Sequence, residues 1–283
     1  MKKGIFFAFF AAGSVLAGQD FGSRIAAIES SKNVRIGVAA FDMATSRRLG
    51  YRETERFQMC STFKVLAVAA VLQRIDHQRE KSDRFIRYTA ADILKYAPVT
   101  REHVAEGGMK LTDLCAAAIE QSDNTAANLV IDALGGPDKV TSFARTLGDR
   151  VTRLDRKEPD LNIATPDGLD TTTPGAMNAD MMALLGGGTL TPSSRAQLEQ
   201  WLVGCETGKL MIRAAAPAEW KIGDKTGRGD TGAINDIAII RPPERKPMFV
   251  AIYMDGVTGP AAEADAIVAM IAKIVFASIS TAR

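Results

Sequence analysis

The amino-acid sequence predicts an α/β fold (α+β, two-lobed), in which an antiparallel five-stranded sheet is built from both termini and flanked by helices, with an inserted all-helical lobe. Three observations lead to this prediction. Strand-like segments lie near both ends of the chain, and apolar residues recur at helical spacing in the middle. No internal repeat or low-complexity linker divides the 283 residues, so we expect one domain with two coupled lobes.

Five segments have the composition and length of β-strands. Three of them, residues 34–42, 233–240 and 248–254, are rich in valine, isoleucine and other apolar residues, and turn-forming residues separate the segments. Two lie near the start of the chain and three near its end, so one sheet must be assembled from both ends. The expected strands are residues 34–42, 48–53, 220–225, 233–240 and 248–254.

The segment between these two groups of strands is predicted to be helical. Ser61 is a candidate N-cap for its first helix, and Gly135-Gly136 ends another. Two threonine–proline pairs mark further helix starts, because proline fits the first helical position. The expected helices are 61–75, 111–121, 125–134, one from Thr173-Pro174 to the glycines at 186–188, one that starts at Thr191-Pro192, and a final helix over 261–277.

The first 17 residues have the pattern of a secretory signal peptide. Lys2 and Lys3 give a basic start, residues 5–16 are mostly apolar, and residues 15–17 offer a small-residue cleavage site. The apolar run is short for a membrane span, and no cysteine stands near the cut, so we expect no stable membrane anchor. A retained anchor and a buried first helix are the alternatives. Export to the periplasm, or secretion, is expected after cleavage.

Charge and cysteine content exclude several classes of function. The formal net charge is +2, and loss of Lys2 and Lys3 with the signal peptide leaves a balanced chain. No basic stripe alternates with aromatic residues, so nucleic-acid binding is not expected. Three cysteines without a CxxC pair and two histidines give no zinc or histidine-rich metal site. Two cysteines could pair after export, or all three could be buried as small apolar residues.

The first of three short motifs is Ser61-Thr62-Phe63-Lys64, at the start of an expected helix. A spacing of three places Ser61 and Lys64 on one helical face. A serine hydroxyl is a weak nucleophile that needs a nearby base, and a lysine amine can act as one when burial or positive charge lowers its pKa. A capping serine beside a solvated lysine is the alternative interpretation.

The second motif is Ser122-Asp123-Asn124, and the third is Lys225-Thr226-Gly227 at the end of an expected strand. The Ser122 hydroxyl could carry a proton to a leaving amine, and Asn124 could hold a substrate amide. Lys225 and Thr226 could bind a substrate carboxylate, with Gly227 allowing close approach of the backbone. The alternatives are a turn or helix cap for the second motif and an edge lysine before a turn for the third.

In this order and with these separations, the three motifs resemble the signature of the class A (serine) β-lactamases, part of which penicillin-binding proteins share. The resemblance extends over nearly the whole chain after the signal peptide. It includes residues 96–100 (YAPVT), 122–128 (SDNTAAN) and 171–174 (TTTP). It implies a β-lactamase/transpeptidase-like fold, a small-molecule β-lactam substrate, and no metal or organic cofactor.

Residues 153–162 (RLDRKEPDLN) resemble the omega loop of the same family. A β-lactamase must hydrolyse its acyl-enzyme, which needs a water molecule and a general base. By the resemblance Glu158 is that base, and Asn162 helps to hold the water. This segment argues against two rivals, a cell-wall transpeptidase or carboxypeptidase and a covalent β-lactam sensor, which acylate without fast hydrolysis. A simple esterase is a third alternative.

The resemblance implies a complete set of roles. Ser61 attacks the lactam carbonyl, while Lys64, or Glu158 through a water, removes the hydroxyl proton; which of the two does so is left open. Ser122 protonates the departing nitrogen, and the backbone N–H groups of Ser61 and Arg228 form the oxyanion hole. The substrate-binding residues are expected to be Asn124, Asn162, Lys225, Thr226, Gly227, Arg228 and Tyr96, although a packing role for Tyr96 is equally plausible.

Several positions depart from the family pattern. The three places where the family often has a carboxylate-binding arginine hold Met211, Ile234 and Asp265, so we expect Arg228 to contact the substrate carboxylate instead.

The other departures concern the omega loop and the cysteines. The loop that follows Asn162 is one residue short, and we expect Asp170 to pair with Arg156 or Arg153. Cys60 precedes the nucleophile, as in some carbapenem-hydrolysing members, but the position of its partner is Gly229. Cys205 stands where asparagine or aspartate is expected.

The expected organisation is therefore a signal peptide at residues 1–17 and a single β-lactamase catalytic domain at residues 18–283. Its α/β lobe is expected to comprise residues 18–55 and 205–283, and its helical lobe residues 56–204. We expect the protein to act as a monomer.

Overall fold

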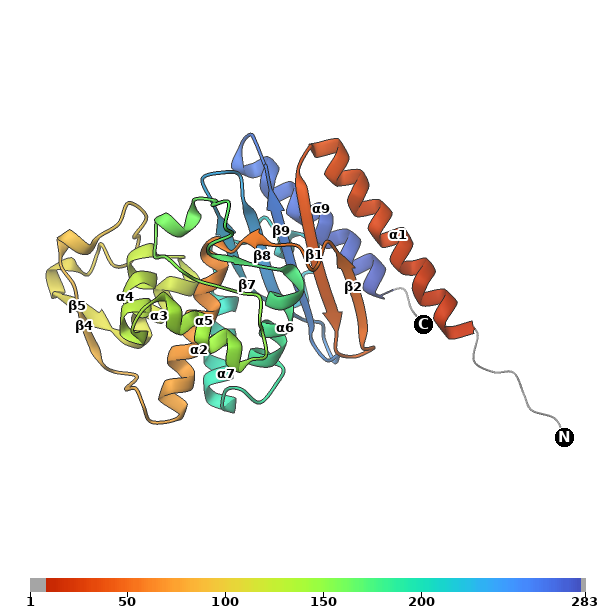
Figure 1. Cartoon of the computed structure of the whole chain (residues 1–283). Helices are drawn as coiled ribbons and strands as arrows, with labels where there is room; N and C mark the ends of the chain where they lie inside the picture. Colours follow the sequence, from red (N-terminus) through yellow and green to blue (C-terminus); the bar gives the residue numbers. More distant parts are fainter. Residues whose placement is uncertain (1–8, 281–283) are drawn as a thin grey trace.

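A computed structural model describes residues 9–280 of the chain. It contains a five-stranded antiparallel sheet in the order β2-β1-β9-β8-β7, which confirms the predicted fold class (Figure 1). The signal-peptide prediction falls partly on residues 1–8, which lie outside the described residues. The strands of the sheet are β1 (Arg35–Asp42), β2 (Arg47–Tyr51), β7 (Lys221–Arg228), β8 (Ile234–Arg241) and β9 (Met248–Asp255).

Pairing between β1 and β9 joins the two ends of the chain. The register runs from Arg35 opposite Asp255 to Asp42 opposite Met248. All but the last residue of β8 and of β9 are buried, so these central strands are apolar on both faces. A strand with both faces covered needs a continuous apolar run, which is what the sequence has at these positions.

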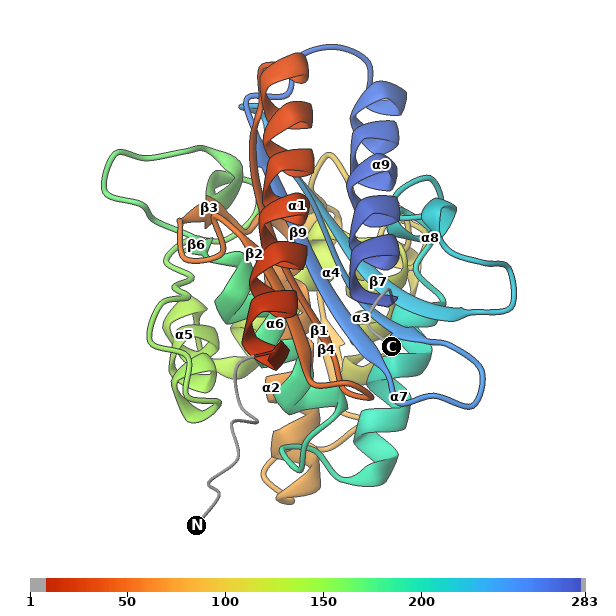
Figure 2. The same cartoon turned by 90° about the vertical axis from the view of Figure 1, so that its right-hand side faces the viewer.

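Helices cover both faces of the sheet. On one face, α1 (Phe9–Lys32) and α9 (Ala261–Ser280) lie side by side (Figure 2), and the short helix α8 (Ile212–Ala215) contacts α9. The helices on the other side of the sheet are α2 (Phe63–Asp76), α3 (Leu111–Glu120), α4 (Asn124–Leu134), α5 (Pro137–Thr146), α6 (Pro174–Leu185) and α7 (Pro192–Val203). Two apolar cores result, one on each side of the sheet.

Helix α1 corresponds to the buried first helix that was an alternative to the signal-peptide interpretation. Several elements were not predicted. They are α5, α8, the two-stranded ladders β3 (Phe57–Gln58) with β6 (Thr171–Thr172) and β4 (Phe85–Arg87) with β5 (Gly108–Lys110), and the 3₁₀ turns η1 (Cys60–Thr62), η2 (Ala90–Asp92), η3 (Val104–Glu106) and η4 (Asp160–Asn162). Part of α1 lies beyond the predicted signal peptide, where Phe21, Ile25 and Ile28 are buried in the core that includes α9. No helix among the described residues is long and apolar enough to cross a membrane.

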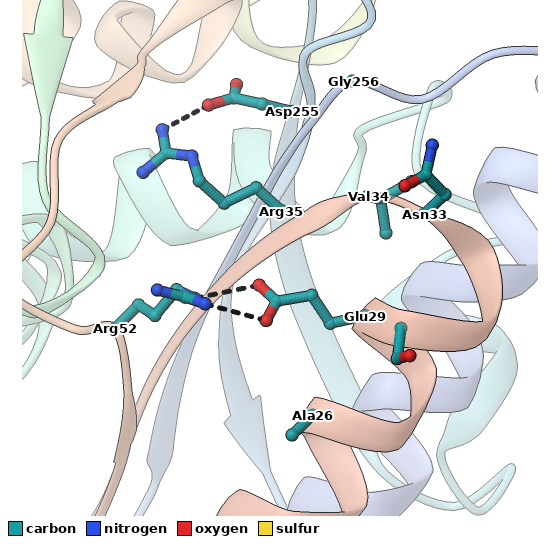
Figure 3. Close-up of a pocket in the computed structure, with 9 residues that line it drawn as sticks. Ala26, Glu29, Asn33, Val34, Arg35, Arg52, Asp255 and Gly256 are labelled. Atoms are coloured by element: carbon teal, nitrogen blue, oxygen red, sulfur yellow. Dashed lines mark hydrogen bonds and ion pairs between the residues drawn. The ribbon is translucent and has the colours of Figure 1, made fainter.

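A network of charged side chains ties the end of α1 to the edge of the sheet (Figure 3). Arg52 Nε donates to Glu29 Oε1 at 2.9 Å, and Arg52 Nη1 donates to Glu55 Oε1 at 2.9 Å. Arg35 pairs with both Glu55 and Asp255. Glu29, Arg35, Arg52 and Asp255 line a cleft of about 500 Å³, and each of the four has a partner of opposite charge.

The segment 153–170 loops out from the β3–β6 ladder and is closed by Asp170. This carboxylate is fully buried. Its Oδ1 accepts hydrogen bonds from the backbone N–H groups of Asp155 and Arg156, at 2.7 and 2.9 Å. Its Oδ2 accepts one from Arg156 Nε at 2.6 Å. Arg153 pairs with Asp155 instead, so Arg156 is the partner of Asp170.

A second buried acid lies near the start of this segment. Asp149 Oδ1 accepts hydrogen bonds from the backbone N–H groups of Val151 and Thr152, at 2.6 and 3.0 Å. Asp180 of α6 is buried beside it. Burial, together with the negative charge of Asp149, raises the pKa of Asp180 to about 9. The Asp180 carboxyl is therefore protonated in the folded protein at neutral pH.

Substitution of Asp170 by asparagine should destabilise the protein strongly. It leaves Arg156 without its anionic partner, and breaking a buried pair in this way costs about 3 kcal/mol. Urea unfolding at 25 °C measures the loss. The matched control in the same segment is Lys157→Ala, whose ion pair with Asp132 is exposed and should contribute at most about 1 kcal/mol. Equal losses in the two variants would contradict the bracing role of Asp170.

Substitution of Asp180 by asparagine should change how stability depends on pH. The folded protein keeps the Asp180 proton up to about pH 9, whereas the unfolded chain loses it near pH 4. The stability of the wild type must therefore fall as pH rises between these values. Because asparagine does not titrate, the Tm of Asp180→Asn relative to wild type should increase from pH 5 to pH 8. A Tm difference that is the same at both pH values would contradict this assignment.

Candidate active site

The three sequence motifs converge on one cleft of about 530 Å³. It lies beside the end of β7, next to the η1 turn and the loops that precede α4. The predicted site residues that line it are Ser61, Tyr96, Ser122, Asn124, Asn162, Thr226 and Arg228. Lys64, Glu158 and Lys225 are buried in contact with these residues. None of the predicted site residues lines the charged cleft beside α1.

Ser61 lies in the η1 turn, which leads directly into α2. The prediction that Ser61 caps this helix is wrong. Thr62 occupies the N-cap position, and no side chain makes a capping hydrogen bond there. Ser61 Oγ instead donates to Glu158 Oε1 at 3.3 Å. The preceding residue, Cys60, has a φ of 45°, a left-handed conformation that is uncommon for a residue other than glycine and concentrates at functional sites.

Lys64 follows Ser61 by one helical turn, and its side chain is completely buried. Its Nζ donates to the backbone oxygen of Ser122 at 2.8 Å and to Asn124 Oδ1 at 2.7 Å. It also lies 3.3 Å from Glu158 Oε1. One carboxylate oxygen therefore contacts both the serine hydroxyl and the lysine amine.

Burial lowers the pKa of Lys64 to about 8, because the ammonium form loses its hydration. The negative charge of Glu158 opposes this shift, and the positive charge of Lys225 adds to it. Burial also lowers the pKa of Lys225. A lysine amine with a pKa near 8 can accept a proton close to neutral pH, which is the property required of a general base.

In the Ser122-Asp123-Asn124 turn, the middle residue caps a helix, and the two outer residues line the cleft. Asp123 Oδ1 accepts from the backbone N–H of Ala126 at 2.8 Å, so Asp123 is the N-cap of α4. Asp123 Oδ2 accepts from the N–H of Thr100 at 2.9 Å, which fixes the loop that carries Tyr96. The cap interpretation thus holds for Asp123 alone, since Ser122 and Asn124 both contact Lys64.

Strand β7 supplies the other wall of the cleft. Lys225 is opposite Ile237, a residue of the core on the α2–α7 side of the sheet, so its side chain points to that side. There its Nζ donates to Ser122 Oγ at 2.9 Å. A Cβ atom on Gly227 would lie 2.8 Å from the backbone oxygen of Met59. Glycine is therefore required for β7 to approach the turn that carries Ser61.

Glu158 reaches the cleft from the 153–170 segment. Its Oε1 contacts Ser61 and Lys64, and its Oε2 accepts from Asn162 Nδ2 at 2.6 Å. Asn162 follows Glu158 by four residues and lines the cleft, where the two side chains form this hydrogen bond. The structure thus brings Ser61, Lys64, Glu158 and Asn162 into one connected group.

Asn128 is a positioning residue that the sequence analysis did not single out. Its Oδ1 accepts from the backbone N–H of Glu158 at 2.9 Å, and its Nδ2 donates to the backbone oxygen of Glu158, also at 2.9 Å. It lies one turn after Asn124 on α4, and residues four apart share a helical face. That spacing indicated that Asn128 faces the same way as Asn124. It could not identify the partner of Asn128, because Glu158 is 30 residues away in the chain.

The remaining substrate-side residues lie at the mouth of the cleft. Thr226 Oγ1 lies 2.6 Å from Thr207 Oγ1, which places a second hydroxyl beside it. Tyr96 is half exposed, and its backbone oxygen accepts from the N–H of Asn124 at 3.0 Å. Arg228 lines the cleft and forms an ion pair with Asp265 of α9. Thr207 and the Arg228–Asp265 pair were not anticipated.

All three cysteines are buried and free, in agreement with the interpretation that they act as small apolar residues. A Cβ atom at Gly229 would lie 2.9 Å from Cys60 Sγ, so residue 229 does face Cys60. Because residue 229 is glycine, Cys60 has no disulfide partner there and is a free thiol. Cys205 Sγ lies 3.3 Å from Thr207 Oγ1. Within the described residues, no group of three or more histidine, cysteine or acidic side chains could hold a metal ion.

Comparison with known proteins shows which family this chain resembles. The model of the Beta-lactamase enzyme family matches residues 20–279. The chain is 46% identical to β-lactamase CTX-M-8 of Citrobacter amalonaticus over 260 residues, which cover 90% of this chain and 88% of the relative. It is 43% identical to β-lactamase OXY-2 of Klebsiella oxytoca over 267 residues, which cover 94% and 92%.

Solved structures agree with these sequence relatives. The last common ancestor of Gram-negative bacteria (GNCA4) β-lactamase class A superposes with a TM-score of 0.89 at 51% identity, covering 92% of this chain and 99% of the other. The putative class A β-lactamase PenP from Rhodopseudomonas palustris superposes with a TM-score of 0.88 at 45% identity, also covering 92% and 99%. The chain therefore belongs to the β-lactamase enzyme family and is a class A serine β-lactamase, an enzyme that hydrolyses the β-lactam ring through a serine acyl-enzyme.

Proposed function

We propose that Ser61, Lys64, Ser122 and Glu158 carry out β-lactam hydrolysis in this enzyme. The observation that carries this assignment is the position of the Glu158 carboxylate, whose Oε1 lies 3.3 Å from both Ser61 Oγ and Lys64 Nζ. A nucleophile within reach of a base that other groups hold in place is the general arrangement for covalent catalysis.

In the proposed acylation step, Ser61 Oγ forms a bond to the lactam carbonyl carbon as its proton leaves. Lys64 Nζ takes this proton directly, or Glu158 takes it through a water. The backbone N–H groups of Ser61 and Arg228 stabilise the oxyanion. The carbon–nitrogen bond of the ring then breaks, and Ser122 protonates the departing nitrogen. The contact of Ser122 Oγ with Lys225 Nζ supports this role, because it supplies a positive charge beside the proton donor.

In the proposed deacylation step, Glu158 removes a proton from a water that attacks the ester carbon, and Ser61 leaves with a proton. The bond from Asn162 to Glu158 Oε2, and the two from Asn128 to its backbone, support this role because they fix the carboxylate in place. A transpeptidase or a sensor would not need a base held in this way.

Substrate recognition is proposed to use the mouth of the cleft. Lys225, Thr226 and Arg228 bind the ring carboxylate, and Gly227 lets the strand backbone approach. Asn124 holds the side-chain amide of the substrate, and Tyr96 forms the rim. The supporting observation is that Thr226, Arg228, Tyr96 and Asn124 all line this one cleft.

We also propose where the enzyme works. Residues 1–17 act as a signal peptide, and the catalytic domain 18–283, with an α/β lobe (18–55 and 205–283) and a helical lobe (56–204), is exported to the periplasm or secreted. There it acts as a monomer on small-molecule β-lactams, without a nucleic-acid partner or a stable membrane anchor. The basic and apolar pattern of the first residues supports the export proposal.

Loss of Glu158 should separate the two chemical steps. With a chromogenic cephalosporin, residues 18–283 should give many turnovers, whereas Glu158→Ala should stop after one equivalent and accumulate an acyl-enzyme that mass spectrometry detects on Ser61. Asp160→Ala is the matched control, because Asp160 is an exposed acid two residues away, and it should turn over like wild type. Sustained turnover by Glu158→Ala, without an accumulated acyl-enzyme, would contradict the proposed role of Glu158 in deacylation.

The pH dependence of acylation should reveal Lys64 as a base. In Glu158→Gln the negative charge that raises the pKa of Lys64 is gone, so this amine should titrate below pH 8. A base works in its neutral form, so the single-turnover rate should increase with pH and level off by about pH 8. Stopped-flow measurements from pH 5 to pH 9 test this. Addition of Lys64→Gln should abolish the increase; a rate independent of pH in Glu158→Gln would exclude Lys64 as the base.

A further inference from the structure

We propose that Asp265 is a specificity-determining positioning residue, which holds the Arg228 guanidinium at the mouth of the cleft in the orientation that binds the carboxylate of the substrate. The observation is the ion pair between Arg228 Nη2 and Asp265 Oδ1. The inference rests on the proposed function, in which Arg228 contacts that carboxylate.

The register of the sheet brings the two side chains together. Arg228 is the last residue of β7 and lies opposite Ile234 of β8. Residues directly opposite one another project from the same face of a sheet. Ile234 is part of the core that contains α9, so Arg228 projects to the α9 side as well. Asp265 meets it there from the second turn of α9.

The two partners differ in their freedom. The Asp265 side chain is only 12% exposed and is attached to a 20-residue helix that packs on the sheet. The Arg228 side chain is 38% exposed and lines the cleft. Asp265 is therefore the fixed member of the pair, and the position of the guanidinium depends on it.

The ion pair leaves Arg228 able to bind a second anion. A guanidinium has five N–H donors in a planar fork. Among the described residues, Asp265 is the one acceptor that the Arg228 side chain contacts, through Nη2. The donors left over can take a substrate carboxylate through two parallel hydrogen bonds, the geometry that arginine favours.

Pre-orientation of Arg228 should act on binding rather than on chemistry. A free arginine side chain loses rotamer freedom when it binds a substrate, and this loss weakens binding. A side chain that Asp265 already holds has lost this freedom before the substrate arrives, so binding does not incur the same cost. Immobilising one such side chain changes affinity by about five-fold. An interaction that is equal in the ground state and the transition state changes KM and leaves kcat unchanged.

The test compares two substrates, a chromogenic cephalosporin and its ring-carboxylate methyl ester, on Asp265→Ala, Asp265→Asn, Arg228→Ala and the double variant Arg228→Ala/Asp265→Ala. Asp265→Ala should raise KM for the acid about five-fold with kcat within two-fold, and should leave KM for the ester unchanged. Asp265→Asn keeps an oxygen acceptor for Nη2, so its KM should lie between wild type and Asp265→Ala. The double variant should have the same KM as Arg228→Ala, because Asp265 acts only through Arg228.

A matched control is the Arg241–Glu199 ion pair, whose side chains are 35% and 11% exposed, close to the values for Arg228 and Asp265. Arg241 lies at the opposite end of β8 from Ile234, away from the cleft. Glu199→Ala should therefore leave KM unchanged for both substrates.

Each contrary outcome has a distinct meaning. If Arg228→Ala raises KM for the acid and Asp265→Ala does not, the role of Asp265 is overturned and the proposed role of Arg228 stands. Unchanged kinetics of Arg228→Ala on the acid would overturn the proposed role of Arg228, and this inference with it. A lower KM for the acid in Asp265→Ala would mean that Asp265 competes with the substrate. Equal effects on acid and ester would reduce Asp265 to a structural role.

Discussion

The contact between Glu158 and Lys64 is the interaction on which the site depends. Both side chains are fully buried, and a buried charge without a partner is costly, so each needs the other. The pair is completed from separate parts of the chain: Lys64 comes from α2, Glu158 from the 153–170 segment, and their remaining partners are Ser122, Asn124 and Asn162. The same carboxylate oxygen receives the Ser61 hydroxyl. In the mechanism proposed above, the arrangement that satisfies these two buried charges also holds the nucleophile beside its base.

This cluster requires precise placement of three chain segments, and the fold supplies each one differently. Strand β7 approaches the η1 turn closely only because residue 227 is glycine. Asp123 joins the start of α4 to the loop of Tyr96 by accepting hydrogen bonds from both. Asp170 closes the 153–170 segment, and Asn128 holds the backbone of Glu158 from α4. Backbone anchors of this kind position catalytic side chains without taking up their functional atoms.

The mouth of the cleft departs from the family pattern in the residues that we propose bind the substrate carboxylate. The positions where the family often has a carboxylate-binding arginine hold Met211, Ile234 and Asp265, and the first two are buried in the core beneath α9. The positive charge stands instead at Arg228, on the strand that carries Lys225 and Thr226. Asp265 then serves as the partner of that arginine. Arg228 lines the same cleft as Thr226 and Ser61.

The sequence by itself determined the fold class, the five strands of the main sheet and the membership of the three motifs in one site. The fold class and the strands follow from local patterns, because the period of apolar residues and the turn-forming residues act over short stretches of chain. The grouping of the three motifs into one site follows from their resemblance to the class A signature. Only the tertiary structure decided that Asp170 pairs with Arg156 and that Ser61 contacts Glu158 and does not cap α2. It also decided that Asn128 contacts the backbone of Glu158 and that Asp265 pairs with Arg228. Each of these is a contact between residues whose distance depends on packing of separate elements. A pattern along the chain carries no information on such a distance, since a polar side chain can satisfy its hydrogen bonds with several partners and burial selects among them.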